Sequence, residues 1–258
     1  MLSVRRISSA AADVEALLLP VACLGCERAQ THGRTDAQVL CDECRLSLRA
    51  IAPPRCGRCG QTKDRWEDRR EARGERREAV CGFCRAWPDS LTWAASAVWY
   101  EDGPAKRLVQ ALKYGGWRVA AGPMAEVMLR ELGPTLRGAD LLVPVPLGRQ
   151  RQRERGHNQA EVLARAIAQR SGLAVADALG RPRETRSQTS LDPRERSANV
   201  AGAFGVRRAS CVVSRKRIVL IDDVLTTGAT LVAAAEALAA AGARDIGAVT
   251  FARAPKPE

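Results

Sequence analysis

The stretch RIVLIDDVLTTGAT, residues 217–230, decides the fold of this chain. It opens with an apolar run typical of a buried strand, and the run ends in two adjacent acids, Asp222 and Asp223. A short loop of threonines around one glycine follows, and the Ala-rich sequence after it, up to Gly242, predicts a helix. A buried strand that turns through a short loop into a helix is the unit of parallel α/β sheets.

The flanking sequence repeats this alternation of strand and helix. Strands are expected at 93–100, 141–146, 217–222 and 245–253, and helices at 104–113, 119–132, 157–172 and 230–242. This order predicts an α/β fold in which helices flank a parallel sheet. The region from 91 to 258 is therefore expected to form the main domain.

The first ninety residues have a different composition. Residues 1–20 form a weak amphipathic lead-in, whereas 21–90 are rich in Cys, Gly, Pro and charge and contain few long apolar stretches. A segment of this kind buries too little surface to fold on its own and needs a cross-link or a metal. We expect a small N-terminal module at 21–90.

Eight of the nine cysteines form four Cys-x-x-Cys pairs, and all four lie in this module. The pairs are Cys23 with Cys26, Cys41 with Cys44, Cys56 with Cys59, and Cys81 with Cys84. Two such pairs supply the four thiolates of a closed tetrahedral site, which selects zinc and leaves no position for water. We predict two structural Zn²⁺ ions, with the pairs combined sequentially; interleaved pairing and an iron–sulfur cluster stay open as alternatives. Cys211 has no partner motif and is interpreted as a structural thiol.

The charge of the chain indicates the class of partner. The formal net charge is +12 and the pI is about 9.8, which favours nucleic acid or phosphorylated substrates, although coding bias toward Arg is an alternative explanation. No apolar run approaches the roughly 20 residues that span a bilayer. Asp13 and Glu15 interrupt the one segment that loosely resembles a signal peptide, so we expect a cytoplasmic protein without a membrane span.

The loop after the acid pair has the composition of an anion site. Backbone N–H groups of the loop and of the helix N-terminus suit a phosphate, and Gly228 permits close approach or a positive φ. Hydroxyl groups are added by Thr226, Thr227 and Thr230. The two carboxylates would repel a phosphate, so they are expected to face sugar hydroxyls or a metal. A phosphate, a ribose diol and Mg²⁺ together describe phosphoribosyl pyrophosphate. A capped turn without a ligand is the alternative, and it explains the threonines but not the adjacent acids.

In this respect RIVLIDDVLTTGAT resembles the phosphoribosyl-pyrophosphate motif of type I phosphoribosyltransferases. The resemblance implies that Asp222 and Asp223 bind the ribose hydroxyls and act in catalysis, with Mg²⁺ arriving with the substrate. It implies that the loop at 226–230 binds the 5′-phosphate. The residues of the motif after the acids are Val224, Leu225, Thr226, Thr227, Gly228, Ala229 and Thr230.

Two further segments occupy positions that are functional in that family. VPVPLGRQRQRERGHNQA, at 143–160, stands where the family has its pyrophosphate loop, and the planar guanidinium group of Arg suits a diphosphate. The candidate residues there are Pro146, Leu147, Arg149, Arg151, Arg153 and Arg155. A solvated basic turn is the alternative for any one arginine. The segment 183–204 stands where the family has a flexible loop, which would close over the site and exclude water.

The order of the motifs is similar to that of the ComF family of competence-associated proteins, over about residues 17–253. The cysteine pairs are followed by LKYGG at 112–116, RGHNQ at 155–159, RSQTSLDPRERSANVAGAF at 186–204 and then the ligand motif. The resemblance implies a zinc-ribbon module joined to a phosphoribosyltransferase-like domain. It also implies a role in handling single-stranded DNA during natural transformation, with a competence helicase as a candidate partner. His157 departs from the pattern, because many relatives are expected to have an aromatic residue there.

Three functional hypotheses follow. The first is an active phosphoribosyltransferase that acts on a base, a nucleotide or nucleic acid by displacement at ribose C1. The second is a non-enzymatic module that senses phosphoribosyl pyrophosphate or holds a DNA phosphate. The third is nucleotide salvage, which gives no reason for a double zinc module. No residue of the sequence stands out as a general base, and the acceptor is not readable.

Overall fold

The structure is a computed structural model, and it describes residues 21–30, 39–62, 81–182, 202–207 and 211–255. The lead-in at 1–20, the charged segment 63–80 and most of the expected flexible loop lie outside these residues. None of the helices described within these ranges is long and apolar enough to cross a membrane.

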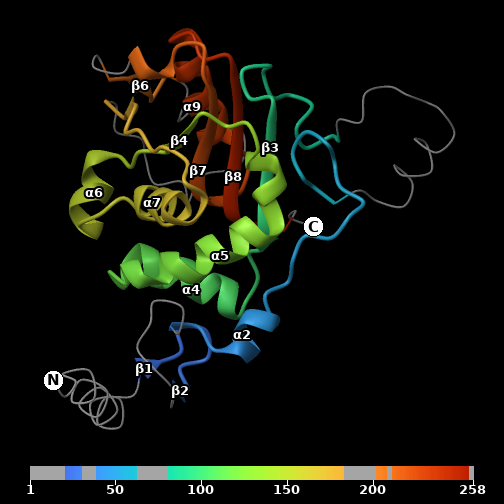
Figure 1. The fold of residues 1–258 in the computed structure, drawn as a ribbon, viewed down its shortest axis with the longest axis vertical. Helices are drawn as coiled ribbons and strands as arrows, with labels where there is room; N and C mark the ends of the chain where they lie inside the picture. The colour runs from blue at the N-terminus through green and yellow to red at the C-terminus, as the bar shows by residue number, and fades with distance from the viewer. Residues whose placement is uncertain (1–20, 31–38, 63–80, 183–201, 208–210, 256–258) are drawn as a thin grey trace, which may run out of the picture.

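The centre of the molecule is a parallel sheet, as the sequence predicted (Figure 1). In spatial order its four strands are β3 (Trp93–Trp99), β8 (Asp245–Arg253), β7 (Arg217–Leu225) and β4 (Leu141–Pro144). At the edge of β4 that faces away from β7, Leu142 forms an isolated parallel bridge with Val175. The two central strands are almost continuously buried, because helices cover both faces of the sheet.

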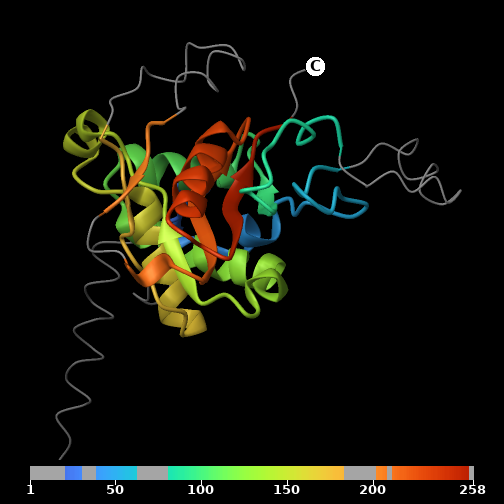
Figure 2. The ribbon, with the colours of Figure 1, turned by 90° about the horizontal axis from the view of Figure 1, so that it is seen from above.

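Helices α5 (Ala121–Leu132) and α7 (Gln159–Ser171) pack on one face of the sheet, and α9 (Ala229–Ala240) packs on the other (Figures 1 and 2). Helix α4 (Pro104–Tyr114) packs beside α5 through leucine and valine side chains that are fully buried. Helix α7 ends at Gly172, which is in the left-handed conformation with φ 73°, as its position in the sequence predicted.

Two elements differ from the sequence prediction. β7 continues through both acids to Leu225, because Asp222 and Val224 keep their register with Thr250 and Ala252 of β8. The strand was expected to end at Asp222, and both acids instead lie within it. The basic segment after β4 forms helix α6 (Arg149–Arg155), which has no buried residue. Without an apolar face, this helix left no periodic signal in the sequence.

Short elements complete the described fold. They are β1 (Val21–Ala22), β2 (Ala29–Gln30), α2 (Asp42–Leu46), η2 (Arg118–Ala120), η3 (Gly133–Leu136), β5 (Leu179–Gly180), β6 (Gly205–Val206) and η5 (Cys211–Val213). β1 pairs with β2, and β5 pairs with β6, both antiparallel.

The cysteine-rich segment covers the outer edge of strand β3. Ala50 forms an antiparallel bridge with Val98, and the Trp99 amide donates to the Arg49 carbonyl at 3.0 Å. Further along, the Ala94 amide donates to the Arg58 carbonyl at 2.7 Å. An uncovered edge strand would expose a row of unpaired backbone groups. The N-terminal segment therefore completes the sheet as well as carrying the cysteines.

Candidate functional site

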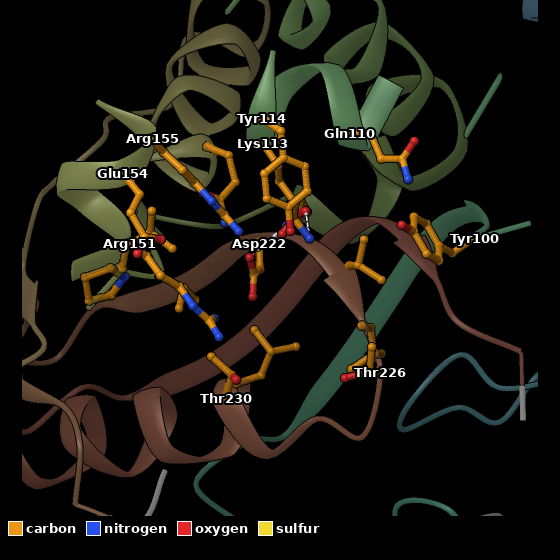
Figure 3. A pocket seen from close by; sticks show the side chains of 18 of the residues that line it. Tyr100, Gln110, Lys113, Tyr114, Arg151, Glu154, Arg155, Asp222, Thr226 and Thr230 are labelled. Atoms are coloured by element: carbon orange, nitrogen blue, oxygen red, sulfur yellow. Dashed lines mark hydrogen bonds and ion pairs between the residues drawn. The ribbon is translucent and has the colours of Figure 1, made fainter. Parts of the chain in front are cut away.

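A cavity of about 830 Å³ lies at the carboxyl end of β7, where open α/β sheets bind their ligands. Its walls come from the end of α4, the segment after β4, helix α6 and the first turn of α9. Figure 3 shows side chains from these elements pointing toward one another across the cavity. Asp222 and Asp223 both belong to its wall.

The acid pair is partly neutralised by a lysine. The Lys113 ammonium nitrogen lies 2.5 Å from Oδ2 of Asp223, and the Asp223 side chain is 5% exposed. The Asp223 amide donates to Oδ1 of Asp222 at 2.8 Å. Lys113 thus opposes the repulsion between the two neighbouring carboxylates.

The two acids have different electrostatics. Burial, followed by the neighbouring charge of Asp223, raises the pKa of Asp222 well above its usual value. Burial also disfavours the ionised form of Asp223, but the charge and hydrogen bond of Lys113 outweigh it and lower the pKa of that carboxyl. The pKa of Lys113 is raised, because Asp223 overcomes the effect of burial. Asp223 is therefore the acid that ionises more readily, and Asp222 is the acid that holds a proton more readily.

The loop after β7 has the geometry of an anion site. Gly228 has φ 84° and is the N-cap of α9, so the first turn of a twelve-residue helix begins at the cavity. Thr226 and Thr230 line the cavity. Thr227 instead accepts a hydrogen bond from the Ala229 amide at 3.4 Å and supports the turn. Of the two roles expected for Gly228, close approach or a positive φ, the structure shows the positive φ.

Helix α6 forms the basic wall. Arg151 and Arg155 are one helical turn apart and both line the cavity, together with Pro146 and Leu147. Arg155 donates to Oε1 of Gln159 at 2.9 Å, and its guanidinium lies 5.0 Å from the centre of the Tyr114 ring. Arg149 and Arg153 alternate with these two along the helix and are not part of the cavity wall. The structure thus brings two of the four candidate arginines to the site.

Several residues of the cavity wall were missed by the sequence reasoning. They are Tyr100, Gln110, Lys113, Tyr114 and Arg181. The motif LKYGG contains two of them, but nothing local to it indicates that the end of α4 meets β7. His157 instead connects the end of α4 to the end of α6: its Nε2 lies 2.7 Å from the Leu112 carbonyl oxygen, and its Nδ1 lies 2.9 Å from that of Arg155.

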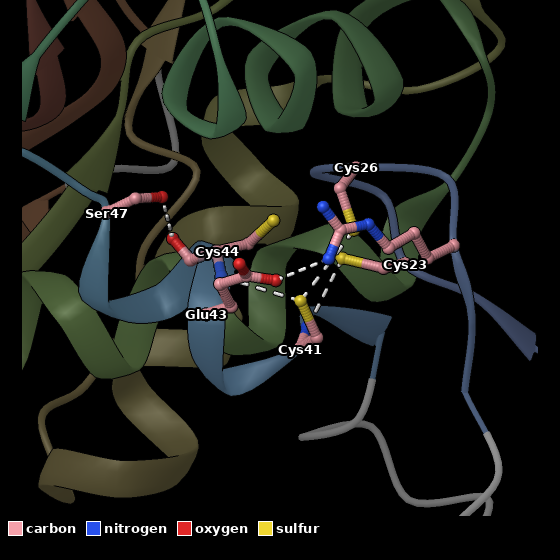
Figure 4. A network of polar contacts seen from close by, with 7 residues as sticks. Cys23, Cys26, Cys41, Glu43, Cys44 and Ser47 are labelled. Carbon is pink, nitrogen blue, oxygen red and sulfur yellow. Dashed lines mark hydrogen bonds and ion pairs between the residues drawn. The ribbon is translucent and has the colours of Figure 1, made fainter.

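The eight paired cysteines gather into two clusters outside the cavity. The first contains Cys23, Cys26, Cys41 and Cys44, and the second contains Cys56, Cys59, Cys81 and Cys84, so the grouping is the sequential one. Figure 4 shows the first cluster, formed between the turn after β1 and helix α2. In each cluster the four sulfurs lie within 4.8 Å of one another.

The spacing of the sulfurs fits zinc. Pairs in the second cluster are separated by 3.5 Å (Cys59 to Cys81) and 3.7 Å (Cys56 to Cys84), too far for disulfides at about 2.05 Å. A zinc–sulfur bond of about 2.3 Å places the corners of a regular tetrahedron about 3.8 Å apart. The four thiolates of each cluster therefore suit one structural zinc ion.

Comparison with known proteins agrees with both halves of this description. Residues 123–258 match the model of the phosphoribosyl transferase domain, and residues 14–85 match that of the double zinc ribbon domain. The chain belongs to the ComF family of phosphoribosyl transferase domain proteins. It is 31% identical over 172 residues to the DNA utilization protein YhgH of Salmonella typhi, covering 64% of this chain and 74% of the relative.

Two further relatives of this ComF protein have the word competence in their names. The chain is 26% identical over 221 residues to Competence protein F of Haemophilus influenzae, and the alignment covers 83% of this chain and 90% of that protein. It is 27% identical over 214 residues to Competence protein ComFC of Streptococcus pneumoniae, which covers 83% and 87% of the two chains. These alignments extend over most of both proteins, so the similarity is not confined to the sheet domain.

Proposed function

We propose that this ComF protein binds phosphoribosyl pyrophosphate with Mg²⁺ in the cavity at the end of β7, and that it acts in the handling of single-stranded DNA during natural transformation. One observation carries the ligand proposal. An acidic floor, an anion loop with a helix N-terminus, and a basic wall converge on one cavity of about 830 Å³. Those three surfaces match the sugar, the 5′-phosphate and the diphosphate of this ligand.

Each part of the ligand has a candidate partner. The loop at 226–230 would bind the 5′-phosphate, with backbone N–H groups and the hydroxyls of Thr226 and Thr230. Asp222 and Asp223 would accept hydrogen bonds from the ribose hydroxyls. Arg151 and Arg155 would bind the diphosphate, since a guanidinium group donates two parallel hydrogen bonds to neighbouring oxygens. Mg²⁺, which prefers oxygen ligands, would enter with the diphosphate and neutralise part of its charge.

Transfer to an acceptor would be a displacement at ribose C1. The bond from C1 to the diphosphate oxygen breaks, the diphosphate leaves with the electron pair, and the acceptor forms the new bond. Positive charge develops on the sugar, and the ionised Asp223 would stabilise that charge. Arg151 and Arg155 would stabilise the negative charge of the departing diphosphate. Lys113 would hold Asp223 in its ionised form throughout.

The surface beside the cavity supports binding of single-stranded DNA. Tyr114 is 71% exposed and Trp117 is 54% exposed, although both are large aromatic residues. The guanidinium of Arg155 lies over the Tyr114 ring. Exposed aromatic rings beside cationic side chains are suited to stacking with unpaired bases. The net charge of +12 favours the same partner, and the relatives named for DNA utilization and competence agree with it.

The remaining assignments follow from this proposal. Residues 21–90 would be a zinc-stabilised module with two structural Zn²⁺ ions, and 91–258 would be the phosphoribosyltransferase-like domain. A competence helicase is a candidate partner. We place the protein in the cytoplasm, where cysteine thiols stay reduced and available for zinc. A non-enzymatic binding module is the second candidate, and nucleotide salvage is the third.

Calorimetric titration of the zinc-loaded protein distinguishes these candidates. Phosphoribosyl pyrophosphate with Mg²⁺ should bind once per chain, and a short single-stranded DNA should change its affinity. Binding without pyrophosphate release in the presence of DNA would favour the non-enzymatic module, and release with a free base would favour salvage. Absence of binding at millimolar ligand would contradict the proposal. The variant Tyr114→Ala/Trp117→Ala should weaken binding of DNA more than binding of the phosphorylated sugar.

A further inference from the structure

Trp87 of the cysteine-rich module lies against Gly228 of the anion loop. A Cβ atom built on Gly228 would lie 2.4 Å from Cζ2 of Trp87, which is closer than two non-bonded carbon atoms can approach. The indole is only 8% exposed, and it fills the space where the side chain of residue 228 would be. Any other residue at 228 would have to displace Trp87, in addition to adopting φ 84°. The two segments therefore fix each other's position.

The position of Trp87 follows from the second cysteine cluster. The amide of Trp87 donates to the carbonyl of Cys84 at 3.1 Å, so Trp87 belongs to the turn that follows the last cysteine of the cluster. The ring of Phe83, which lies between the last two cysteines, meets the Trp87 ring edge to face with centres 5.6 Å apart. The turn formed by Cys81 and Cys84 thus sets the direction in which Trp87 points.

Arg253 connects the same cluster to the residue that precedes the loop. Its side chain is 1% exposed, and its guanidinium donates at 2.7 Å to the carbonyl of Cys59 and at 2.7 Å to Oε1 of Gln61. The guanidinium also lies 4.5 Å from the centre of the Phe83 ring. A buried cation at this place offsets the negative charge that four thiolates bring to a zinc site.

The backbone of Arg253 reaches the anion loop directly. Arg253 is in register with Leu225 of β7, and the next amide, that of Ala254, donates to the Leu225 carbonyl at 2.9 Å. Leu225 immediately precedes Thr226, the first residue of the loop. The second cluster therefore reaches the residue just before the loop through Arg253 and contacts the middle of the loop through Trp87.

The first cluster has no such connection among the described residues. It is attached to the helices, where Arg107 of α4 donates to the carbonyl of Gly25 at 3.0 Å and Arg45 of α2 forms an ion pair with Glu126 of α5. None of its cysteines is part of the cavity wall. Figure 1 shows α2 with β1 and β2 beyond α4, away from the strand ends that form the cavity.

We propose that the second cysteine cluster, when its thiolates hold a metal, positions the anion loop at 226–230 through Trp87 and Arg253, and that the first cluster does not. The metal at the second cluster would then control how well the cavity binds a phosphorylated ligand. The identity of that ligand rests on the proposed function, whereas the positioning of the loop does not. If the second cluster were only a structural cross-link, the loop would keep its order when Trp87 alone is changed.

Hydrogen–deuterium exchange on the ligand-free full-length protein tests this positioning directly. The variants are Cys56→Ser/Cys84→Ser for the second cluster, Cys23→Ser/Cys44→Ser for the first, and Trp87→Ala, which leaves all eight cysteines in place. Amides at 226–230 should exchange about tenfold or more faster in the second-cluster variant and in Trp87→Ala, because the loop opens locally. They should exchange at the wild-type rate in the first-cluster variant.

Zinc content and a conservative variant make each outcome decisive. Trp87→Ala should retain as much zinc as the wild type, whereas each cysteine variant should lose one ion. Trp87→Phe keeps an aromatic ring next to Phe83 and should recover most of the protection at 226–230. Wild-type exchange at the loop in Trp87→Ala, or equal loss of protection in both cysteine variants, would overturn the proposal.

Binding measurements separate this proposal from the proposed function. If wild-type protein binds phosphoribosyl pyrophosphate, Trp87→Ala should bind it about tenfold or more weakly, as is typical when an ordered binding loop must be fixed again on binding. If the wild type does not bind it, the proposed ligand is wrong, but the exchange experiment still decides whether the second cluster positions the loop.

Discussion

The ammonium group of Lys113 lies 2.5 Å from a carboxylate oxygen of Asp223, although the two residues are more than a hundred positions apart in the chain. This contact explains how two adjacent acids are accommodated within a buried strand. One acid is ionised and paired with the lysine, and the other lies beside it with a raised pKa. The acidic floor of the cavity depends on the end of α4 as much as on β7.

Replacing the lysine should therefore damage both stability and binding. Lys113→Met leaves Asp223 buried without its partner, and breaking such a pair from one side costs about 3–5 kcal/mol. The free energy of unfolding, measured in urea at neutral pH, should fall by that order. Affinity for phosphoribosyl pyrophosphate should fall as well, because the floor of the cavity loses its arrangement.

Lys106 provides the matched control in the same helix. It forms an exposed ion pair with Asp102 four residues earlier, and exposed pairs contribute little to stability. Lys106→Met should leave unfolding and ligand binding close to wild type. Equal effects of the two lysine substitutions would show that the contact with Asp223 has no special role.

The raised pKa of Asp222 predicts a specific pH dependence. A carboxyl whose pKa is higher in the folded state contributes stability that is fully present below the unfolded value of about 4 and is lost as the pH rises toward the folded value. Asp222→Asn removes this contribution. Relative to wild type, the variant should gain stability as the pH is raised from about 4 toward the folded pKa of Asp222.

Paired urea unfolding curves at each pH provide the measurement. Both proteins carry the same cysteine clusters, so the titration of the thiols cancels in the difference between them. A difference in the free energy of unfolding that does not change with pH would contradict the assignment of the raised pKa to Asp222.

The basic wall allows a comparison at constant charge. Arg151→Gln/Arg155→Gln removes the two arginines of the cavity wall, and Arg149→Gln/Arg153→Gln removes two from the same helix outside it. Charge-assisted hydrogen bonds contribute about 1.5–3 kcal/mol each, so the first variant should bind inorganic pyrophosphate at least about tenfold more weakly. The second should differ from wild type only through the lost charge. Equal losses in the calorimeter would mean that helix α6 attracts anions without contacting them.

Removal of zinc should proceed in two stages. All four cysteines of the second cluster are buried and Arg253 lies beside them, whereas Cys26 and Cys41 of the first are only half-buried. With a colorimetric chelator, the first cluster should release its ion faster than the second. Arg253→Met should speed only the slower phase, because it removes the buried cation that lies beside these thiolates. A single phase of release, or equal acceleration of both, would argue against this order.

The sequence predicted the parts of this molecule that depend on local pattern. The parallel sheet, the helix cap at Gly172, the positive φ of Gly228 and the sequential cysteine clusters each rest on residue type and spacing. The ladder between β7 and β8 was underestimated, because hydrogen bonds between strands continue past the point where the side chains become polar. Helix α6 was missed because it buries no side chain.

Contacts between residues of distant elements could not be predicted from the local sequence pattern. Lys113 meets Asp223 only because α4 ends against β7, and this depends on how the helices pack. Trp87 belongs to no motif of the sequence, and its contact with Gly228 joins two segments that the sequence places in separate regions. The long-range contacts of a site follow from the packed fold rather than from the spacing of any motif.

The most direct test of the central claim is calorimetric titration of phosphoribosyl pyrophosphate with Mg²⁺ into zinc-loaded wild-type protein and into Asp222→Asn/Asp223→Asn. Circular dichroism and zinc content first establish that the variant is folded, and the single variant Asp222→Asn, which keeps the ion pair with Lys113, serves as the check if it is not. We expect one ligand to bind per wild-type chain, weaker binding to the single variant and none to the double variant at millimolar ligand. Equal affinity of the wild type and a folded acid variant would contradict the claim that this acid pair binds the ribose.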